Sequence, residues 1–119
     1  MAEVNVYKSG TVNVSDEVIG VIGSIAASEI PGVHALSGSF SEEMMERIGK
    51  KNFQKGVHVQ LTGDTAVIEL DVIIDQGNVL AEIGERIQRA VTLAVESMTG
   101  ITVTAVHVNI QGLSFKSNG

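Results

Sequence analysis

The chain contains no cysteine and no tryptophan, a single proline, and only 3% aromatic residues. The absence of cysteine excludes disulfide bonds, thiolate metal sites and cysteine nucleophiles. The scarcity of aromatic side chains argues against a nucleic-acid module that stacks bases. The core must therefore be built mainly from Val, Ile, Leu and Ala, which supply most of the 44% of residues that are hydrophobic.

Basic charge is also scarce, because 8 Lys and Arg residues stand against 14 Asp and Glu residues and give a net charge of −6. This balance argues against general binding of phosphate backbones unless the basic residues cluster. No apolar run approaches the roughly 18 residues that a membrane-spanning helix needs. The first ten residues lack the basic start and apolar core of a signal peptide. At 119 residues, we expect one globular cytoplasmic domain that does not itself insert into a membrane.

The longest periodic segment is residues 78–100, where apolar side chains recur at steps of three and four and so gather on one face of a helix. We expect Asn78 to cap its N-terminus and Gly100 to end it in a left-handed conformation. Gly84 lies beside the apolar row, so we expect it to let the helix approach the sheet and Gly84→Leu to overpack the contact. The predicted row consists of Leu80, Ile83, Ile87, Val91, Ala94 and Met98.

A second helix is predicted to begin after Ser15, a favourable N-cap, and to run to about Ile30, where Pro31 and Gly32 stop it. Acidic residues in its first turn suit the helix dipole. Its predicted buried stripe consists of Val18, Ile22, Ile25 and Ala26, flanked by Ile19 and Val21.

Two features of this second helix need an explanation. Gly20 and Gly23 form a GxxG, which KH RNA-binding modules carry in a loop; inside an apolar helical pattern, close packing is the favoured interpretation. Glu29 projects near the apolar stripe. Either the helix ends before burying this side chain, or its carboxylate accepts hydrogen bonds from the backbone that follows at residues 32–33, which is the interpretation we favour.

Strand patterns occupy most of the remaining sequence. The alternating runs 57–62 and 66–75, joined by a turn at residues 62–64, predict a β-hairpin with one apolar and one polar face. The run 101–111 is partly apolar on both faces, which indicates two-sided burial or a bulge near Ala105 and Val106. Shorter strand candidates are 4–6, 11–14 and 33–36.

The predicted order is β-α-β-(α)-β-β-α-β, in which the bracketed element is a short helix over residues 41–49. This order predicts an α/β (α+β) fold: a two-layer sandwich in which two main helices cover one face of a mixed β-sheet. We expect a single domain over residues 1–113 and a flexible tail over residues 114–119.

Half of all basic residues fall within nine positions, at Arg47, Lys50, Lys51 and Lys55. One interpretation is an anion-binding site for a phosphate, a nucleic acid or an acidic lipid surface. The other is a solvated turn on an acidic protein. The sequence alone leaves both open.

Side chains able to do chemistry are present but are not spaced as in known sites. The histidines, His34, His58 and His107, match no zinc motif, although His58 and His107 meet if their strands are neighbours. No GxSxG nucleophile elbow occurs. Glu69, Asp71 and Asp75 share the outward face of one strand, where carboxylates serve solubility. We therefore expect no catalytic residues, no cofactor and no metal.

The outer face of the helix at residues 78–100 is mostly charged and polar, and Leu93 is an apolar exception. Such a face is available to a partner protein. The candidate partner surface consists of Glu82, Glu85, Arg86, Arg89 and Leu93.

Four stretches carry a family resemblance that spans nearly the whole chain. They are GTVNVSDEVIGVIGSIAASEIPGV at residues 10–33, GKKNFQKGVHVQL at 49–61, AVIELDVIIDQGNVLAEIGERIQRAV at 66–91 and VESMTGITVTAVHVNIQGLSF at 95–115. In this order and spacing the chain resembles the alkaline shock protein family, also called Gls-type general stress proteins, of Gram-positive bacteria. It departs from many relatives at Gln76, where they carry Tyr before the glycine.

The resemblance implies a non-enzymatic cytoplasmic protein of the envelope or alkaline stress response. It implies a scaffold that self-associates as a homo-oligomer or is tethered to the membrane by a small membrane anchor protein, with nucleic acid not an expected partner. The alternative function is an RNA- or anion-binding module that uses the basic residues at 47–55.

Overall fold

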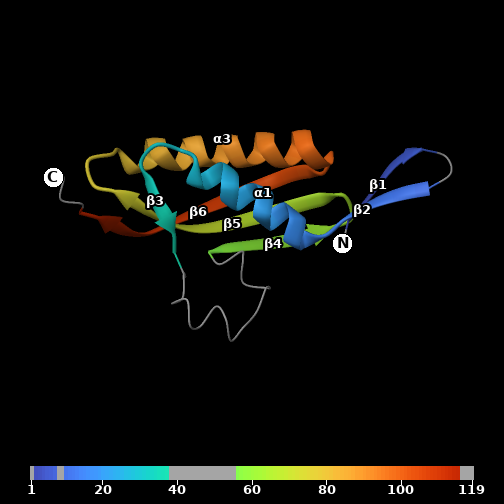
Figure 1. Cartoon of the computed structure of the whole chain (residues 1–119), viewed down its shortest axis with the longest axis horizontal. Helices are drawn as coiled ribbons and strands as arrows, with labels where there is room; N and C mark the ends of the chain where they lie inside the picture. The colour runs from blue at the N-terminus through green and yellow to red at the C-terminus, as the bar shows by residue number, and fades with distance from the viewer. Residues whose placement is uncertain (1, 8–9, 38–55, 116–119) are drawn as a thin grey trace, which may run out of the picture.

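The computed structural model describes residues 2–7, 10–37 and 56–115. Helices α1 and α3 lie side by side on one face of a mixed β-sheet, and the β1-β2 ribbon projects from one end (Figure 1). The predicted two-layer α+β fold is therefore confirmed. The elements are β1 (Ala2–Tyr7), β2 (Gly10–Val14), α1 (Asp16–Ser28), β3 (Val33–Leu36), β4 (Val57–Thr62), β5 (Thr65–Asp75), α3 (Leu80–Thr99) and β6 (Thr102–Ser114).

Strand β5 is the centre of the main sheet. One of its edges pairs in parallel with β6 from Thr65 to Asp75, and the other pairs antiparallel with β4 and then with β3. The parallel β5-α3-β6 unit requires the helix to cross over one face of the sheet. The sequence predicted β4-β5 as a hairpin, and the pairing of Thr62 with Thr65 confirms it.

The core lies between β5 and the helices. Alternate β5 side chains are buried because they point at the helical layer, and those between them face the open side of the sheet. The core side chains of β5 are Ala66, Ile68, Leu70, Val72 and Ile74; those of α3 are Ile83, Ile87, Val91 and Val95.

The ends of α3 differ in how well the sequence predicted them. Gly100 ends the helix with φ 77°, as expected. The prediction of Asn78 as N-cap is wrong, because the cap position is Val79 and has no side-chain cap bond. The Asn78 amide instead donates to the Asp75 carbonyl at 2.7 Å and ties α3 to the end of β5.

The buried row of α3 advances by four residues at each step and therefore contains Val95 in place of the predicted Ala94. The predicted ends of the row are wrong, because Leu80 is 39% and Met98 70% exposed. A steady step of four keeps the row over a twisted sheet, and residues outside that step turn away from it.

Helix α1 begins at its predicted cap, where the Val18 N–H donates to Ser15 Oγ at 3.2 Å. Its predicted buried stripe is wrong at Val18 and Ile25, which are exposed, whereas Ile22 and Ala26 are partly buried and pack against the core as predicted. Ile19 and Ala27 are fully buried, and Gly20 and Gly23 are buried with them. A Cβ at Gly23 would lie 3.5 Å from Val91 Cγ1, so this face of small residues packs closely on α3. The interpretation of the GxxG as a packing feature is therefore confirmed.

Of the two interpretations of Glu29, the favoured one is wrong, and the helix ends before burying the side chain. Glu29 is exposed at the C-cap of α1. The backbone that was expected to bind it is used elsewhere, because the Val33 N–H donates to the Ile30 carbonyl at 3.0 Å.

Strand β6 confirms the predicted bulge. The register with β5 shifts between Val103 and Ala105 and again between Ile110 and Gly112. Each shift inserts one residue and changes which side chains face the helices, so Val103 and Val106 are both buried. The predicted start of the tail is wrong, because Ser114 belongs to β6 and its carbonyl accepts the Gln76 N–H at 2.9 Å.

The predicted order also concerns the N-terminal strand, the short helix at residues 41–49 and the C-terminal tail. The strand candidate at residues 4–6 is confirmed as part of β1, which pairs with β2 and adds one strand to the predicted order. The predicted helix at residues 41–49 and the last four tail residues lie outside the described residues.

The expected close approach at Gly84 is wrong, because among the described residues no atom outside the helix's own backbone lies within 4 Å of a Cβ built there. We therefore expect Gly84→Ala to raise the free energy of unfolding by roughly 0.5–1 kcal/mol, since Ala replaces the poorest non-proline helix former. Urea unfolding of the two proteins measures this difference. A loss of stability would show that a close neighbour does face position 84.

Candidate interaction surfaces

The candidate anion-binding residues Arg47, Lys50, Lys51 and Lys55 lie outside the described residues. The structure does show where the flanking chain departs and returns. The Ser37 N–H donates to the Asp71 carbonyl at 2.7 Å, and the Asp71 N–H donates to the Gly56 carbonyl at 2.8 Å. Both flanks therefore meet at one residue of the central strand.

The five predicted partner-surface residues are all exposed on α3. Leu93 is 70% exposed, and Arg89 Nη2 lies 3.3 Å from Glu85 Oε1 in an ion pair one helical turn long. A shallow hollow of about 330 Å³ lies on this side of the helix. It is lined by Gln88, Arg89, Thr92, Leu93 and Glu96.

Two of these lining residues also bind the outer edge of β6, which the sequence analysis did not anticipate. Gln88 Nε2 donates to the Val106 carbonyl at 3.0 Å, and the Val103 N–H donates to Glu96 Oε2 at 2.9 Å. Side chains of α3 thus satisfy backbone groups that an edge strand would otherwise expose. The sequence feature that could have predicted these bonds is the presence of long polar side chains, Gln88 and Glu96, directly beside the buried row of α3.

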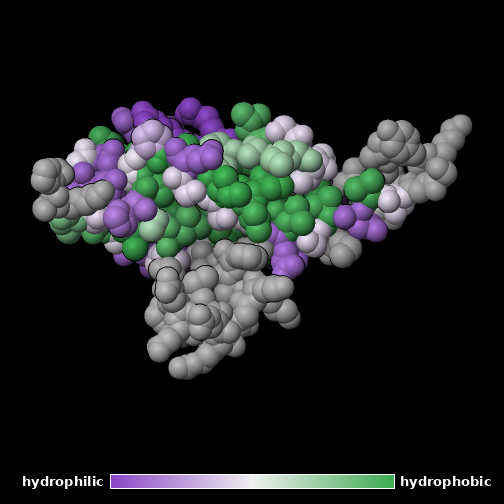
Figure 2. Space-filling model, in the orientation of Figure 1, coloured by the Kyte–Doolittle hydropathy of each residue, from purple (hydrophilic) through white to green (hydrophobic). Residues whose placement is uncertain are grey.

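Helix α1 presents an apolar ridge that the sequence assigned to the core. Val18 is 47%, Val21 36% and Ile25 52% exposed. Figure 2 shows hydrophobic surface across the region of α1. The sequence could have predicted an exposed apolar ridge, because apolar residues surround α1 on more sides than one buried face requires.

The open face of the sheet carries a polar row across three strands. His58 on β4 and His107 on β6 each pair in register with Glu69 on β5, so the two histidines flank it without being adjacent. Asn109 Nδ2 donates to Glu69 Oε2 at 2.8 Å and to Asp71 Oδ1 at 2.9 Å. A surface hollow of about 490 Å³ lies over His58, Glu69 and His107. Within the part of the chain that the structure describes, no three His, Asp or Glu side chains converge on a metal position.

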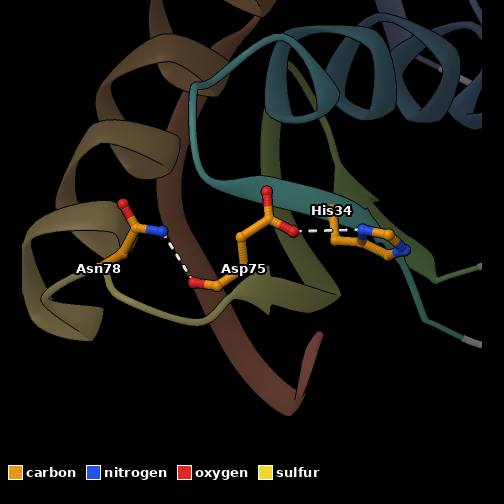
Figure 3. Close-up of polar contacts among 3 residues, drawn as sticks. All are labelled: His34, Asp75 and Asn78. Atoms are coloured by element: carbon orange, nitrogen blue, oxygen red, sulfur yellow. Dashed lines mark hydrogen bonds and ion pairs between the residues drawn. The ribbon is translucent and has the colours of Figure 1, made fainter. Parts of the chain in front are cut away.

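A second polar cluster joins three elements at the end of β5 (Figure 3). His34 Nδ1 lies 3.2 Å from Asp75 Oδ1, and the Asp75 N–H donates to the Gly32 carbonyl at 2.7 Å. Together with the bond from Asn78, these contacts connect the segment after α1 to the start of α3. His34 and Asp75 are both partly exposed, so the cluster serves as a surface junction rather than an enclosed site.

Neither described helix combines the length and the apolar content needed to cross a bilayer.

Solved structures of MamM CTD share this fold. One of them is 17% identical, with a TM-score of 0.50, and the match covers 81% of this chain and 96% of that chain. At this identity the likeness concerns the fold alone.

Similarity in sequence is more informative. YqhY of Bacillus subtilis is 33% identical over 106 residues, which cover 89% of this chain and 78% of YqhY. YloU of the same organism is 27% identical over 89% of this chain and 90% of YloU, and Spy1614 of Streptococcus pyogenes is 28% identical over 89% of each. A family model described as having a cell envelope-related function matches residues 4–115. The chain belongs to the alkaline shock protein 23 family.

Proposed function

We propose that this protein is a non-enzymatic scaffold of the cell envelope stress response, which holds other proteins at the membrane or associates with itself. Family membership supports the link to the cell envelope. The observation that carries the scaffold role is the apolar ridge of α1, formed by Val18, Val21 and Ile25.

The ridge is unusual for the outer face of a helix. Its members follow one another at steps of three and four, so they form a continuous stripe along α1. Contiguous exposed apolar surface marks interaction sites on soluble proteins. A helical partner segment with its own apolar stripe fits such a surface, because two helices pack by inserting rows of side chains into grooves.

The charged outer face of α3 would orient the partner rather than provide most of the binding energy. Glu85 and Arg89 are 66% and 75% exposed in their side chains, and exposed ion pairs contribute little to affinity. Charges at the rim of an interface mainly select partners and speed their encounter.

Fractionation of Bacillus subtilis cells that express the tagged protein tests this proposal. We expect the wild type to sediment with the envelope fraction under alkaline stress. Val21→Ser combined with Ile25→Ser should weaken binding to the envelope about thirtyfold and lower that recovery, since two apolar contacts of roughly 1 kcal/mol each are lost.

Val79→Ser is the matched control, because Val79 is 61% exposed but lies at the start of α3, away from the ridge. It should leave envelope recovery unchanged. Recovery of the wild type only as a free cytosolic protein would overturn the proposal, and so would equal recovery of the ridge variant.

A further inference from the structure

The outer edge of β6 is protected over only part of its length. Within the described residues, α3 side chains bind this edge at Val103 and Val106, and no comparable bond reaches the following residues. Edge strands expose unpaired N–H and C=O groups that pair readily with another strand. Among the residues that the structure describes, the backbone edge of β6 beyond Val106 is therefore left without a partner.

Position 84 explains why the protection stops there. The buried row of α3 advances by four residues, so the flanking row on the β6 side is Gly84, Gln88, Thr92 and Glu96. One helical turn back from Gln88 is about 6 Å, which corresponds to about two residues of strand. Because α3 runs antiparallel to β6, Gly84 lies beside Val108. Glycine has no side chain to bind that edge, and open space adjoins it.

We propose that this open edge pairs with the same edge of a second copy of the chain, β6 against β6, antiparallel about a twofold axis near Val108 and Asn109. This inference rests on the self-association included in the proposed function and names its surface. The pairing would join the two main sheets into one continuous sheet.

The sequence of β6 suits pairing with itself. From Thr102 to Ser114 the strand has no proline and no Asp, Glu, Lys or Arg, so no like charges meet across the twofold axis. Its register with β5 is regular from Val106 to Ile110. Val108 and Ile110 therefore present their backbone groups on the free side, as Val106 does. Across the axis, Val108 of one copy faces Ile110 of the other. His107 and Asn109, which lie between them, continue the polar open face.

The helical layer fits the same axis. Two α3 helices related by it would run antiparallel and meet near Gly84, where the absence of a side chain permits the 8–10 Å separation of packed helices. Leu113 and Phe115, which are 42% and 71% exposed at the end of the strand, lie along the surface that the second copy would cover.

Gly84→Gln tests the proposal. A glutamine there extends the protective row by one turn, occupies the helix contact and improves helix propensity. By sedimentation velocity at micromolar concentration, we expect the wild type to have twice the 12.5 kDa mass of one chain. The variant should have the mass of one chain and unfold at the same or a higher urea concentration.

Ser97→Gln is the matched control, because it places glutamine at an exposed position of the same helix, more than three turns away from Gly84. It should remain a dimer. Amide hydrogen exchange measures the strand contact directly. The Val108 and Ile110 amides should be protected in the wild type and should exchange at least about tenfold faster in Gly84→Gln.

A monomeric wild type overturns the proposal, as does a Gly84→Gln variant that stays dimeric. A monomer whose Val108 amide becomes protected only on adding an extended peptide would also overturn it, because the edge would then serve another protein. These results concern the purified chain, so they are separable from loss of envelope recovery, which tests the scaffold role.

Discussion

Gly56→Ala should lower the free energy of unfolding by about 2–5 kcal/mol. Gly56 has φ 80°, where an L-side chain costs roughly 1–2 kcal/mol. A Cβ at this position would also overlap the Ser37 carbonyl oxygen, which is backbone and has no rotamer to change. Relief of that overlap by moving β3 away from β4 adds about 1–3 kcal/mol.

The location of Gly56 explains why movement is costly. Its carbonyl accepts the Asp71 N–H, and the Asp71 carbonyl accepts the Ser37 N–H. A shift that separates residues 37 and 56 therefore strains two hydrogen bonds to the central strand. Urea unfolding followed by circular dichroism measures the loss.

Gly63→Ala is the matched control for this prediction. Gly63 has φ 63° in the β4-β5 turn, but nothing lies within 4 Å of its Cβ position. It should incur only the backbone cost of roughly 1–2 kcal/mol. Equal losses for the two variants would show that contact with Ser37 contributes nothing.

The strands were the most predictable part of the fold. In β5, polar and apolar residues alternate with few exceptions, so period two defined both the strand and its buried face. The same logic failed for α1, where apolar residues surround the helix. Gly20 and Gly23 decide which side is buried, because contact with α3 requires small residues, and a count of hydrophobic positions underweights them.

The candidate surfaces were predictable in part. Exposure of the charged α3 face followed from its polar composition, and Leu93 lies there as expected. The link from Gln88 and Glu96 to β6 was not predictable, because it depends on how far the helix overhangs the sheet edge.

Ile19→Ala should cost about 2–5 kcal/mol, whereas Ile25→Ala should cost less than about 1 kcal/mol. Both changes remove the same atoms from the same helix, so they share helix propensity and unfolded-state effects. Ile19 is fully buried, and its truncation leaves a cavity between α1 and the sheet. Ile25 is 52% exposed, so alanine there removes contacts that are already partly solvated.

The comparison also tests which face of α1 forms the core. A helix buried on the Val18 and Ile25 side would reverse the order of the two losses in urea unfolding. If Ile19→Ala costs more than Ile25→Ala, as expected, the exposed ridge is a property of the folded chain, and Ile25→Ala truncates it in a protein that stays stable. Binding effects of ridge substitutions then report on the partner contact itself, since a domain of this size that keeps most of its 5–15 kcal/mol of stability remains folded.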